Sequence, residues 1–227
     1  MSEIDLLSSV PIFSDLQSTD LEELYSRMSI RKYQKNDIIL MEDEFGDTLF
    51  IISEGSIKIT RVSEDGREVI LAILGEGEFF GEMSLLDGQT RSANAIAQTG
   101  CHVLILKRHD FLEVLEKFPK IAVSLLSELA IRIRKSDQQI ESFALSDAEQ
   151  RIGITIIRLA EELGTIHKGV VRIAKLPYQQ DIANMAGTSR ETVSRMLKLL
   201  EDKKLISRKA HTSVSYTHLT LPTNREV

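Results

Sequence analysis

The spacing of apolar residues changes near Asp110, and this change divides the chain into a β-rich part and a helical part. Before it, short apolar runs alternate with glycine-containing turns, which predicts many short strands in an antiparallel barrel or sandwich. After it, apolar residues recur every three or four positions, which predicts helices. The chain is therefore expected to have an α+β fold. The runs that predict strands are 38–40, 49–52, 57–62, 68–74 and 103–106.

Local signals add a hairpin turn and two short helices to this outline. Asp65-Gly66 lies between two β-rich runs and predicts a type I′ hairpin turn, since both residues tolerate a positive φ angle. A short helix is expected over about 18–28, and another over 109–118. Pro119 can occupy the first turn of the next helix, where its missing N–H group has no partner to lose.

The helix that starts at Pro119 carries a heptad repeat to about Phe143. Such a seam suits a parallel coiled coil between two copies of the chain, which is the interpretation that we favour. The alternative is a helix that packs on its own domain. Ser136 is the one hydroxyl in the seam, so it either fixes the register or contacts a ligand. The seam consists of Ala122, Leu126, Leu129, Ile133, Ser136, Ile140 and Phe143.

A further helix follows the long one almost at once. Ser146 and Glu149 have the spacing of a capping box, which predicts a helix over about 147–163. Gly164 can end that helix. The segment 143–147 is therefore expected to be a hinge and the domain boundary.

The segment from Tyr178 to Ile206 fits a helix-turn-helix, in which Gly187 forms the turn and Thr188 begins the cap of the second helix. The N-terminal end of such a recognition helix meets base edges in the major groove, where arginine can bind guanine and a carboxylate can accept from cytosine. The alternative is an ordinary helical hairpin with a solvated charged face. The residues on that exposed end, which could contact bases, are Arg190, Glu191 and Ser194 or Arg195, and the expected phosphate contacts are Gln180, Ser189, Thr192 and Lys198.

The charge of the chain is distributed unevenly. The whole chain carries −6, which taken as an average argues against a nucleic-acid partner. Residues 175–209, however, hold eight Lys and Arg against four Asp and Glu, which gives +4. Because residues 210–227 are neutral overall, residues 1–174 carry −10. The basic segment coincides with the helix-turn-helix, as expected of a module that binds double-stranded DNA.

A second candidate site lies in the β-rich part, in the segment 80–93. Gly81 permits a close approach of the backbone, and N–H groups in a tight turn can bind an anion. Arg91 can bind a phosphate through two hydrogen bonds, Ser92 can add a hydroxyl, and Glu82 can accept from a ribose hydroxyl. The alternative is an internal salt bridge between Glu82 and Arg91.

Both segments resemble functional motifs of the Crp–Fnr family of bacterial transcription regulators. Residues 81–86 with 91–93 are similar to the phosphate-binding cassette of a cyclic-nucleotide-binding domain, and residues 187–197 are similar to the family's recognition helix. The resemblance covers about residues 10–212. It implies a cyclic-nucleotide-binding β-roll over 1–118, a dimerisation helix and hinge over 119–145, and a winged helix-turn-helix over 146–212.

The resemblance also implies ligands and partners. The effector is expected to be a cyclic nucleotide, and cyclic AMP in particular. The resemblance implies that Arg190, Glu191 and Arg195 are the three base-reading residues. A homodimer would use them on a DNA palindrome with half-sites like TGTGA, and RNA polymerase is an expected partner. Asp137 departs from the pattern, because the cyclic-AMP branch has a hydroxyl there; an adenine N6 amine could still donate to it. The residues implied to bind the effector are Gly81, Glu82, Met83, Arg91, Ser92 and Ser136, with Asp137 reaching across from the partner subunit.

Several other classes of protein are not favoured. The single cysteine, Cys101, excludes a four-cysteine iron–sulfur cluster, and the histidines lack ligand spacing, so neither a metal site nor an enzyme is expected. The absence of a long apolar run and the acidic N-terminus predict a cytoplasmic protein without a membrane partner. The alternatives left open are a family member that responds to cyclic di-GMP, to haem or redox state, or to no effector, and a regulatory subunit of a kinase or channel.

The last segment departs from the family pattern. Where the resemblance implies a β-hairpin wing, Pro222 and its polar neighbours do not suit a central strand. Residues 214–227 resemble a translated sequencing adapter. We therefore expect a non-native tail over 213–227.

Overall fold

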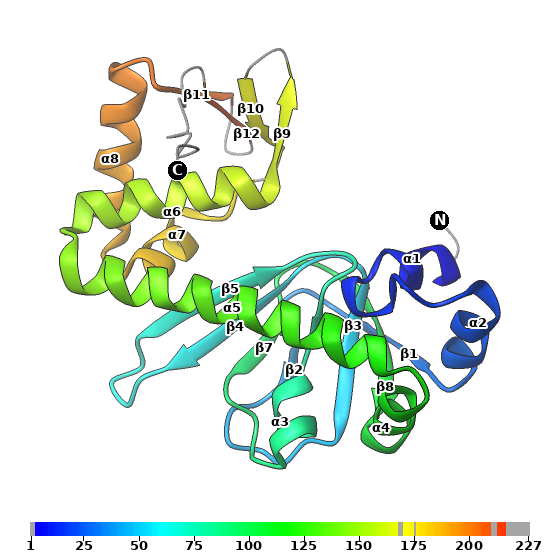
Figure 1. Cartoon of the computed structure of the whole chain (residues 1–227). Helices are drawn as coiled ribbons and strands as arrows, with labels where there is room; N and C mark the ends of the chain where they lie inside the picture. Colours follow the sequence, from blue (N-terminus) through cyan, green and yellow to red (C-terminus); the bar gives the residue numbers. More distant parts are fainter. Residues whose placement is uncertain (1–2, 168–169, 175, 210–212, 217–227) are drawn as a thin grey trace, which may run out of the picture. The chain divides into compact units, whose positions relative to one another are not determined.

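The structure is a computed structural model that describes residues 3–167, 170–174, 176–209 and 213–216 (Figure 1). It consists of two compact units, residues 1–137 and residues 138–227. Both units combine helices with antiparallel sheets, which confirms the expected α+β class. None of the described helices is long and apolar enough to cross a membrane.

Within the described residues, the first unit contains eight strands in two antiparallel sheets of four. The strands are β1 (Ser29–Tyr33), β2 (Ile38–Leu40), β3 (Thr48–Glu54), β4 (Ile57–Val62), β5 (Glu68–Leu74), β6 (Phe79–Phe80), β7 (Asn94–Ala97) and β8 (Cys101–Lys107). Their order is β1-β8-β3-β6 in one sheet and β2-β7-β4-β5 in the other. The sequence missed β1, β6 and β7. Strand β1 is an exposed edge strand without an apolar run, β6 has only two residues, and β7 has four, of which two are alanine.

The central strand β3 is apolar on both of its faces. Leu49 and Ile51 belong to a core that also contains residues of the helices, whereas Phe50 and Ile52 belong to the core of the roll. Successive side chains of a strand point to opposite faces, so a strand buried on both sides needs an unbroken apolar run. This explains why β3 and its neighbour β8 were recognisable from the sequence.

The β4–β5 hairpin forms where the sequence predicts it, but the turn is of a different type. Gly66 has a φ angle of 81°, whereas Asp65 is not among the residues with positive φ, and a type I′ turn needs both. Ser63 accepts from the N–H group of Gly66 at 2.8 Å and donates its own N–H group to Arg67 at 2.9 Å. The turn is therefore longer than two residues, and a glycine alone takes the left-handed position.

Helices cover one face of the first sheet. The helical segments are α1 (Glu3–Ser9), a 3-10 turn η1 (Pro11–Phe13), α2 (Ser18–Ser26), α3 (Glu82–Asp87), α4 (Arg108–Lys117) and α5 (Pro119–Leu145). The expected helices over 18–28 and 109–118 are thus confirmed as α2 and α4. Buried residues of α1, α2, α4 and the start of α5 join Leu49 and Ile51 in one hydrophobic core.

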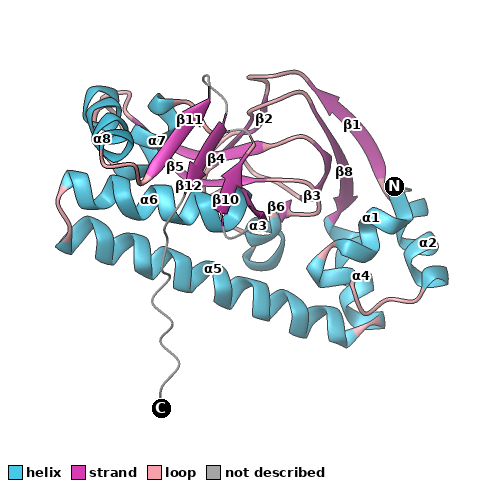
Figure 2. Cartoon of the chain, turned by 90° about the horizontal axis from the view of Figure 1, so that it is seen from above, coloured by secondary structure: helices cyan, strands magenta, loops and turns pink. Residues whose placement is uncertain are grey.

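Helix α5 is continuous through Leu145 (Figure 2). Its hydrogen-bond ladder extends to the N–H group of Ser146, which donates to the carbonyl oxygen of Ser142 at 3.1 Å. The break before the next helix, which begins at Ala148, therefore lies at the end of the segment 143–147, and a hinge there stays a prediction. Nothing in Phe143-Ala144-Leu145 disfavours a helix, since the segment has neither glycine nor proline. The boundary between the two compact units lies further back, between residues 137 and 138.

The apolar stripe of α5 is exposed in this single chain over most of the expected seam. Ala122 and Leu129 are half-buried, and Leu129 packs against the core of the first unit. The first turns of α5 belong to that core, which covers part of the seam at its N-terminal end. The expected seam residues that are exposed are Leu126, Ile133, Ser136, Ile140 and Phe143.

The second unit contains three further helices and a four-stranded sheet. The elements are α6 (Ala148–Leu163), β9 (Gly164–His167), β10 (Val170–Ile173), α7 (Gln179–Ala186), α8 (Arg190–Asp202), β11 (Ile206–Lys209) and β12 (Ser213–Tyr216). The strand order is β11-β12-β10-β9. The sheet lies along α6, with β9 and β10 in contact with that helix (Figure 2).

Helix α6 begins with a capping box that is one residue later than expected. Asp147, not Ser146, is the N-cap, and its carboxylate accepts from the N–H group of Gln150 at 2.9 Å. The Gln150 side chain in turn accepts from the N–H group of Asp147 at 2.9 Å. Aspartate is as good an N-cap as serine, so the one-residue choice depended on where α5 ends.

Residues 213–216, at the start of the expected tail, form β12. This strand pairs with both β10 and β11, so it is part of the sheet of the second unit. With β11 it makes the hairpin that the resemblance implies after the recognition helix. Residues 217–227, including Pro222, lie outside the described residues, and the origin of the tail stays a prediction.

Candidate functional site

The segment 80–93 connects β6 to α3 and continues to β7. Gly81 lies at its tightest point, with a φ angle of 83°. A Cβ atom at this position would lie 2.8 Å from Arg91 Nη1 and 3.0 Å from the carbonyl oxygen of Thr48. Only glycine fits, because both the left-handed backbone and the close approach exclude a side chain.

Arg91 is buried beneath this turn, with 4% of its surface exposed. Its Nη1 atom donates to the carbonyl oxygen of Gly81 and to the hydroxyl of Ser84, both at 2.7 Å. Its Nη2 atom donates to Thr48, at 2.9 Å to the carbonyl oxygen and at 3.1 Å to the hydroxyl. The guanidinium is thus held by neutral acceptors of α3, of β3 and of the turn that contains Gly81.

The charge of Arg91 has no direct counter-ion in the part of the chain that the structure describes. No ion pair within 4.0 Å includes Arg91, although Asp47 and Glu82 are near enough to favour its charged form. Burial lowers the pKa of Arg91, and those two carboxylates oppose that shift. Among the described atoms its Nε is buried without a hydrogen-bond partner. A buried cation with an unused donor is suited to an anionic ligand.

Glu82 pairs with a residue that the sequence analysis missed. It is buried, and its Oε1 atom accepts from Arg132 Nη1 at 2.9 Å. Arg132 also donates to the carbonyl oxygen of Phe79 at 2.7 Å and lies 4.5 Å over that ring. The alternative of an internal Glu82–Arg91 salt bridge is therefore wrong, since the described ion pair of Glu82 is with α5. The signal available in the sequence was the position of Arg132, one helical turn before Ser136.

The other expected effector residues lie at the surface of the first unit. Met83 is half exposed, and the exposed Ser92 hydroxyl is 3.6 Å from the Met83 sulfur. Ser136 and Asp137 are exposed on α5, and the Ser136 hydroxyl donates to the carbonyl oxygen of Arg132 at 3.0 Å. Their roles toward an effector stay predictions.

In the second unit, α7 and α8 form the expected helix-turn-helix. Gly187 makes the turn with a φ angle of 58°, and a Cβ atom there would lie 2.7 Å from the Phe143 ring. Ile182 and Ala183 of α7 are buried, as is Val193 of α8. The expected packing of the two helices is therefore confirmed.

The cap of α8 is Ser189 rather than Thr188. The Ser189 hydroxyl accepts from the N–H group of Thr192 at 3.2 Å and lies 3.1 Å from the Thr192 hydroxyl. Both hydroxyls expected to contact phosphate therefore sit at the helix N-terminus. Gln180 is exposed on α7 and donates to Asn184 at 2.9 Å.

The three expected base-reading residues share the exposed face of α8. Arg190, Glu191 and Arg195 are all exposed, as is Lys198. Hydrogen bonds from its own backbone N–H group and from Ser189, with the charge of Arg190, hold the pKa of Glu191 below its usual range. Glu191 is therefore an ionised acceptor at neutral pH, as a contact to a cytosine amine requires.

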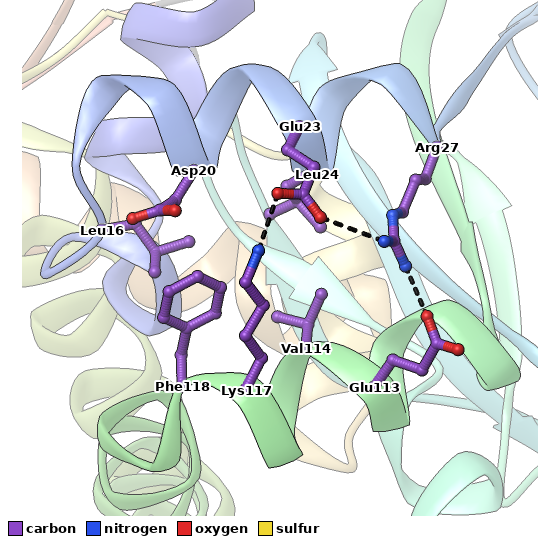
Figure 3. Close-up of a pocket in the computed structure, with 9 residues that line it drawn as sticks. All are labelled: Leu16, Asp20, Glu23, Leu24, Arg27, Glu113, Val114, Lys117 and Phe118. Carbon is purple, nitrogen blue, oxygen red and sulfur yellow. Dashed lines mark hydrogen bonds and ion pairs between the residues drawn. The ribbon is translucent and has the colours of Figure 1, made fainter.

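A pocket elsewhere in the first unit has a different character (Figure 3). It lies between α2 and α4 and contains none of the expected effector residues. Its charged groups pair with one another: Glu23 accepts from Lys117 at 2.7 Å and from Arg27 at 3.0 Å. We interpret it as the seam between two packed helices.

Two family models match the chain at the positions of the two sites. The cyclic nucleotide-binding domain model matches residues 30–118, which include the segment 80–93. The Crp-like helix-turn-helix domain model matches residues 148–219, which include α7 and α8.

Whole proteins and solved structures agree with these matches. The cAMP-activated global transcriptional regulator CRP of Pasteurella multocida is 36% identical, over 86% of this chain and 94% of its own length. The cyclic AMP receptor protein of Thermus thermophilus is 32% identical, over 86% of this chain and 88% of its own length. The crystal structure of the Thermus thermophilus catabolite activator protein has a TM-score of 0.55 at 30% identity, covering 91% of this chain and 93% of that one. The c-di-GMP responsive regulator CLP of Xanthomonas campestris shares the fold, with a TM-score of 0.73 at 24% identity and coverage of 88% and 99%. The chain therefore belongs to the Crp–Fnr family and is a cyclic-nucleotide-binding transcription regulator with a DNA-binding helix-turn-helix.

Proposed function

We propose that the chain binds cyclic AMP in the β-roll and, as a homodimer, a TGTGA-like DNA palindrome through α8, from which it acts on RNA polymerase in the cytoplasm. The observation that carries the effector part is Arg91, a buried cation without a described counter-ion and with one unused donor. The singly charged phosphodiester of a cyclic nucleotide supplies the missing charge and an acceptor.

The neighbouring side chains suit the rest of such a nucleotide. Glu82 is fixed by Arg132 and can accept from a ribose hydroxyl, while Met83 and Ser92 lie at the exposed rim of the same segment. Ser136 lies on α5 one turn after Arg132, which places it on the helix that Glu82 already contacts. We assign Ser136, and Asp137 of the partner subunit, to the purine.

The exposed stripe of α5 supports the homodimer. Leu126, Ile133 and Ile140 are each more than 60% exposed, although large apolar side chains of a soluble protein are usually covered. Their spacing of seven is the repeat that a parallel coiled coil buries. Two copies would then present two recognition helices to the two halves of a palindrome.

A guanine-bearing nucleotide is the second candidate effector. The observation that favours it is Asp137, whose carboxylate can accept from the adjacent N1–H and N2–H groups of guanine, whereas adenine offers only its N6 amine. The Xanthomonas campestris relative is described as responsive to c-di-GMP.

Calorimetry with cyclic AMP, cyclic GMP and cyclic di-GMP tests the effector. Cyclic AMP is expected to bind best, and Arg91→Leu is expected to abolish binding while the far-ultraviolet circular dichroism is unchanged. Fluorescence anisotropy with a labelled TGTGA palindrome, with and without cyclic AMP, tests the regulator. Binding of cyclic AMP by Arg91→Leu with the affinity of the unaltered protein would reject the effector site.

A further inference from the structure

We propose that Ser84 and Thr48 are positioning residues, which hold the Arg91 guanidinium so that its Nε–H group is the donor presented to the effector's phosphate. This inference rests on the proposed function and deepens it, because it names the residues that orient Arg91 and the atom that Arg91 offers. Neither Ser84 nor Thr48 is needed to supply a contact to the effector itself.

The argument starts from the five N–H donors of an arginine side chain. Gly81 and Ser84 accept from Nη1, both at 2.7 Å. The carbonyl and hydroxyl oxygens of Thr48 accept from Nη2, at 2.9 and 3.1 Å. Four acceptors on the chain thus match the four Nη donors. In the described part of the chain, the fifth donor, on Nε, is buried and without a partner.

The Ser84 and Thr48 hydroxyls accept from different nitrogen atoms of the guanidinium, Ser84 from Nη1 and Thr48 from Nη2. Ser84 is on α3 and Thr48 begins β3, so the planar group is fixed between two elements of the roll. Ser84 is itself buried, with 3% of its surface exposed, and its hydroxyl lies 3.5 Å from the carbonyl oxygen of Gly81. An alanine at position 84 would leave Nη1 with one acceptor and permit the guanidinium to turn toward a phosphate with its Nη edge.

Gly46 provides the remaining restraint. A Cβ atom at Gly46 would overlap Nε, Cζ and Nη2 of Arg91, so the loop backbone packs closely against the guanidinium group. The Arg91 backbone is also bound to this loop: its N–H group donates to Glu44 at 2.8 Å, and its carbonyl oxygen accepts from Asp43 at 2.9 Å. Backbone and side chain of Arg91 are therefore fixed before an effector arrives, which lowers the entropic cost of binding.

The first experiment compares Ser84→Ala and Thr48→Val with Thr60→Val, by calorimetry with cyclic AMP and its two phosphorothioate diastereomers. Thr60 is a matched control, since its hydroxyl is buried in the same unit without a described partner. Ser84→Ala and Thr48→Val are expected to bind cyclic AMP about tenfold more weakly, as for loss of a hydrogen bond to a charged group. Their discrimination between the diastereomers is expected to shrink, because the phosphate is no longer met by one fixed donor.

Thr60→Val and Ser84→Thr, which keeps a hydroxyl at position 84, are expected to behave as the unaltered protein does. Unaltered affinity and unaltered discrimination in both Ser84→Ala and Thr48→Val would overturn the proposal.

A second experiment separates this proposal from the proposed function. The Arg91 Nε–H resonance of the full chain, assigned by its loss in Arg91→Lys, is expected to exchange slowly with water when no nucleotide is present. In Ser84→Ala the exchange is expected to be about tenfold faster, since one anchor is lost. If the unaltered protein binds none of the cyclic nucleotides, the proposed function fails. The exchange rate alone then decides the positioning role: faster exchange in Ser84→Ala supports it, and an unchanged rate overturns it.

Discussion

Arg132 Nη1 lies 2.9 Å from Glu82 Oε1, and this ion pair fastens the long helix α5 to the segment that holds Arg91. The same guanidinium donates to the carbonyl oxygen of Phe79, just before Gly81. A change in the orientation of Glu82 would therefore alter its contact with Arg132 of α5, the helix that also carries Ser136.

Arg132→Met is expected to destabilise the protein by about 1–3 kcal/mol, because it leaves the buried carboxylate of Glu82 without its partner. Thermal unfolding measures the loss. The double variant with Glu82→Gln should recover part of it, since no buried charge then remains. Equal stability of the single and double variants would show that the pair is not coupled.

Gly46→Ala is expected to weaken cyclic AMP binding by about tenfold or more, because the new Cβ atom must displace the Arg91 guanidinium. Calorimetry measures the affinity. Gly75→Ala is the matched control, since a Cβ atom at Gly75 would meet only the Glu78 side chain, at 3.9 Å. Similar affinities for the two variants would contradict the close contact between Gly46 and Arg91.

Ile133→Glu is expected to convert a dimer to a monomer, because it places a charge in the centre of the exposed apolar stripe of α5. Light scattering coupled to gel filtration measures the mass. Gln138→Glu adds the same charge at an exposed position outside the stripe and should remain dimeric. A dimer that survives Ile133→Glu would move the interface away from α5.

Glu191→Ala is expected to relax the preference for one base pair of the half-site by about 1–3 kcal/mol. Anisotropy with duplexes altered at each position measures the change. Lys198→Ala is the contrasting variant: it should weaken all duplexes similarly and reduce the salt dependence, as loss of a phosphate contact does. Uniform weakening by Glu191→Ala would instead assign that residue to the DNA backbone.

The sequence by itself determined the elements whose burial leaves a pattern. The unbroken apolar runs of β3 and β8, the helix-turn-helix around Gly187 and the segment of Gly81 and Arg91 could all be found because their periodicity or spacing depends on near neighbours in the chain. The same is true of the basic charge of residues 175–209.

Only the tertiary structure decided which partners meet across the fold. Arg132 is fifty residues from Glu82, and Thr48 is 43 residues from Arg91, so no local pattern joins them. The packing of Leu129 on the first unit half-buries one position of the expected α5 seam, and the end of that helix moved the cap from Ser146 to Asp147. Each of these outcomes depends on packing surfaces and hydrogen-bond partners that distant parts of the chain supply. The order of residues along the chain does not show which of those parts come together.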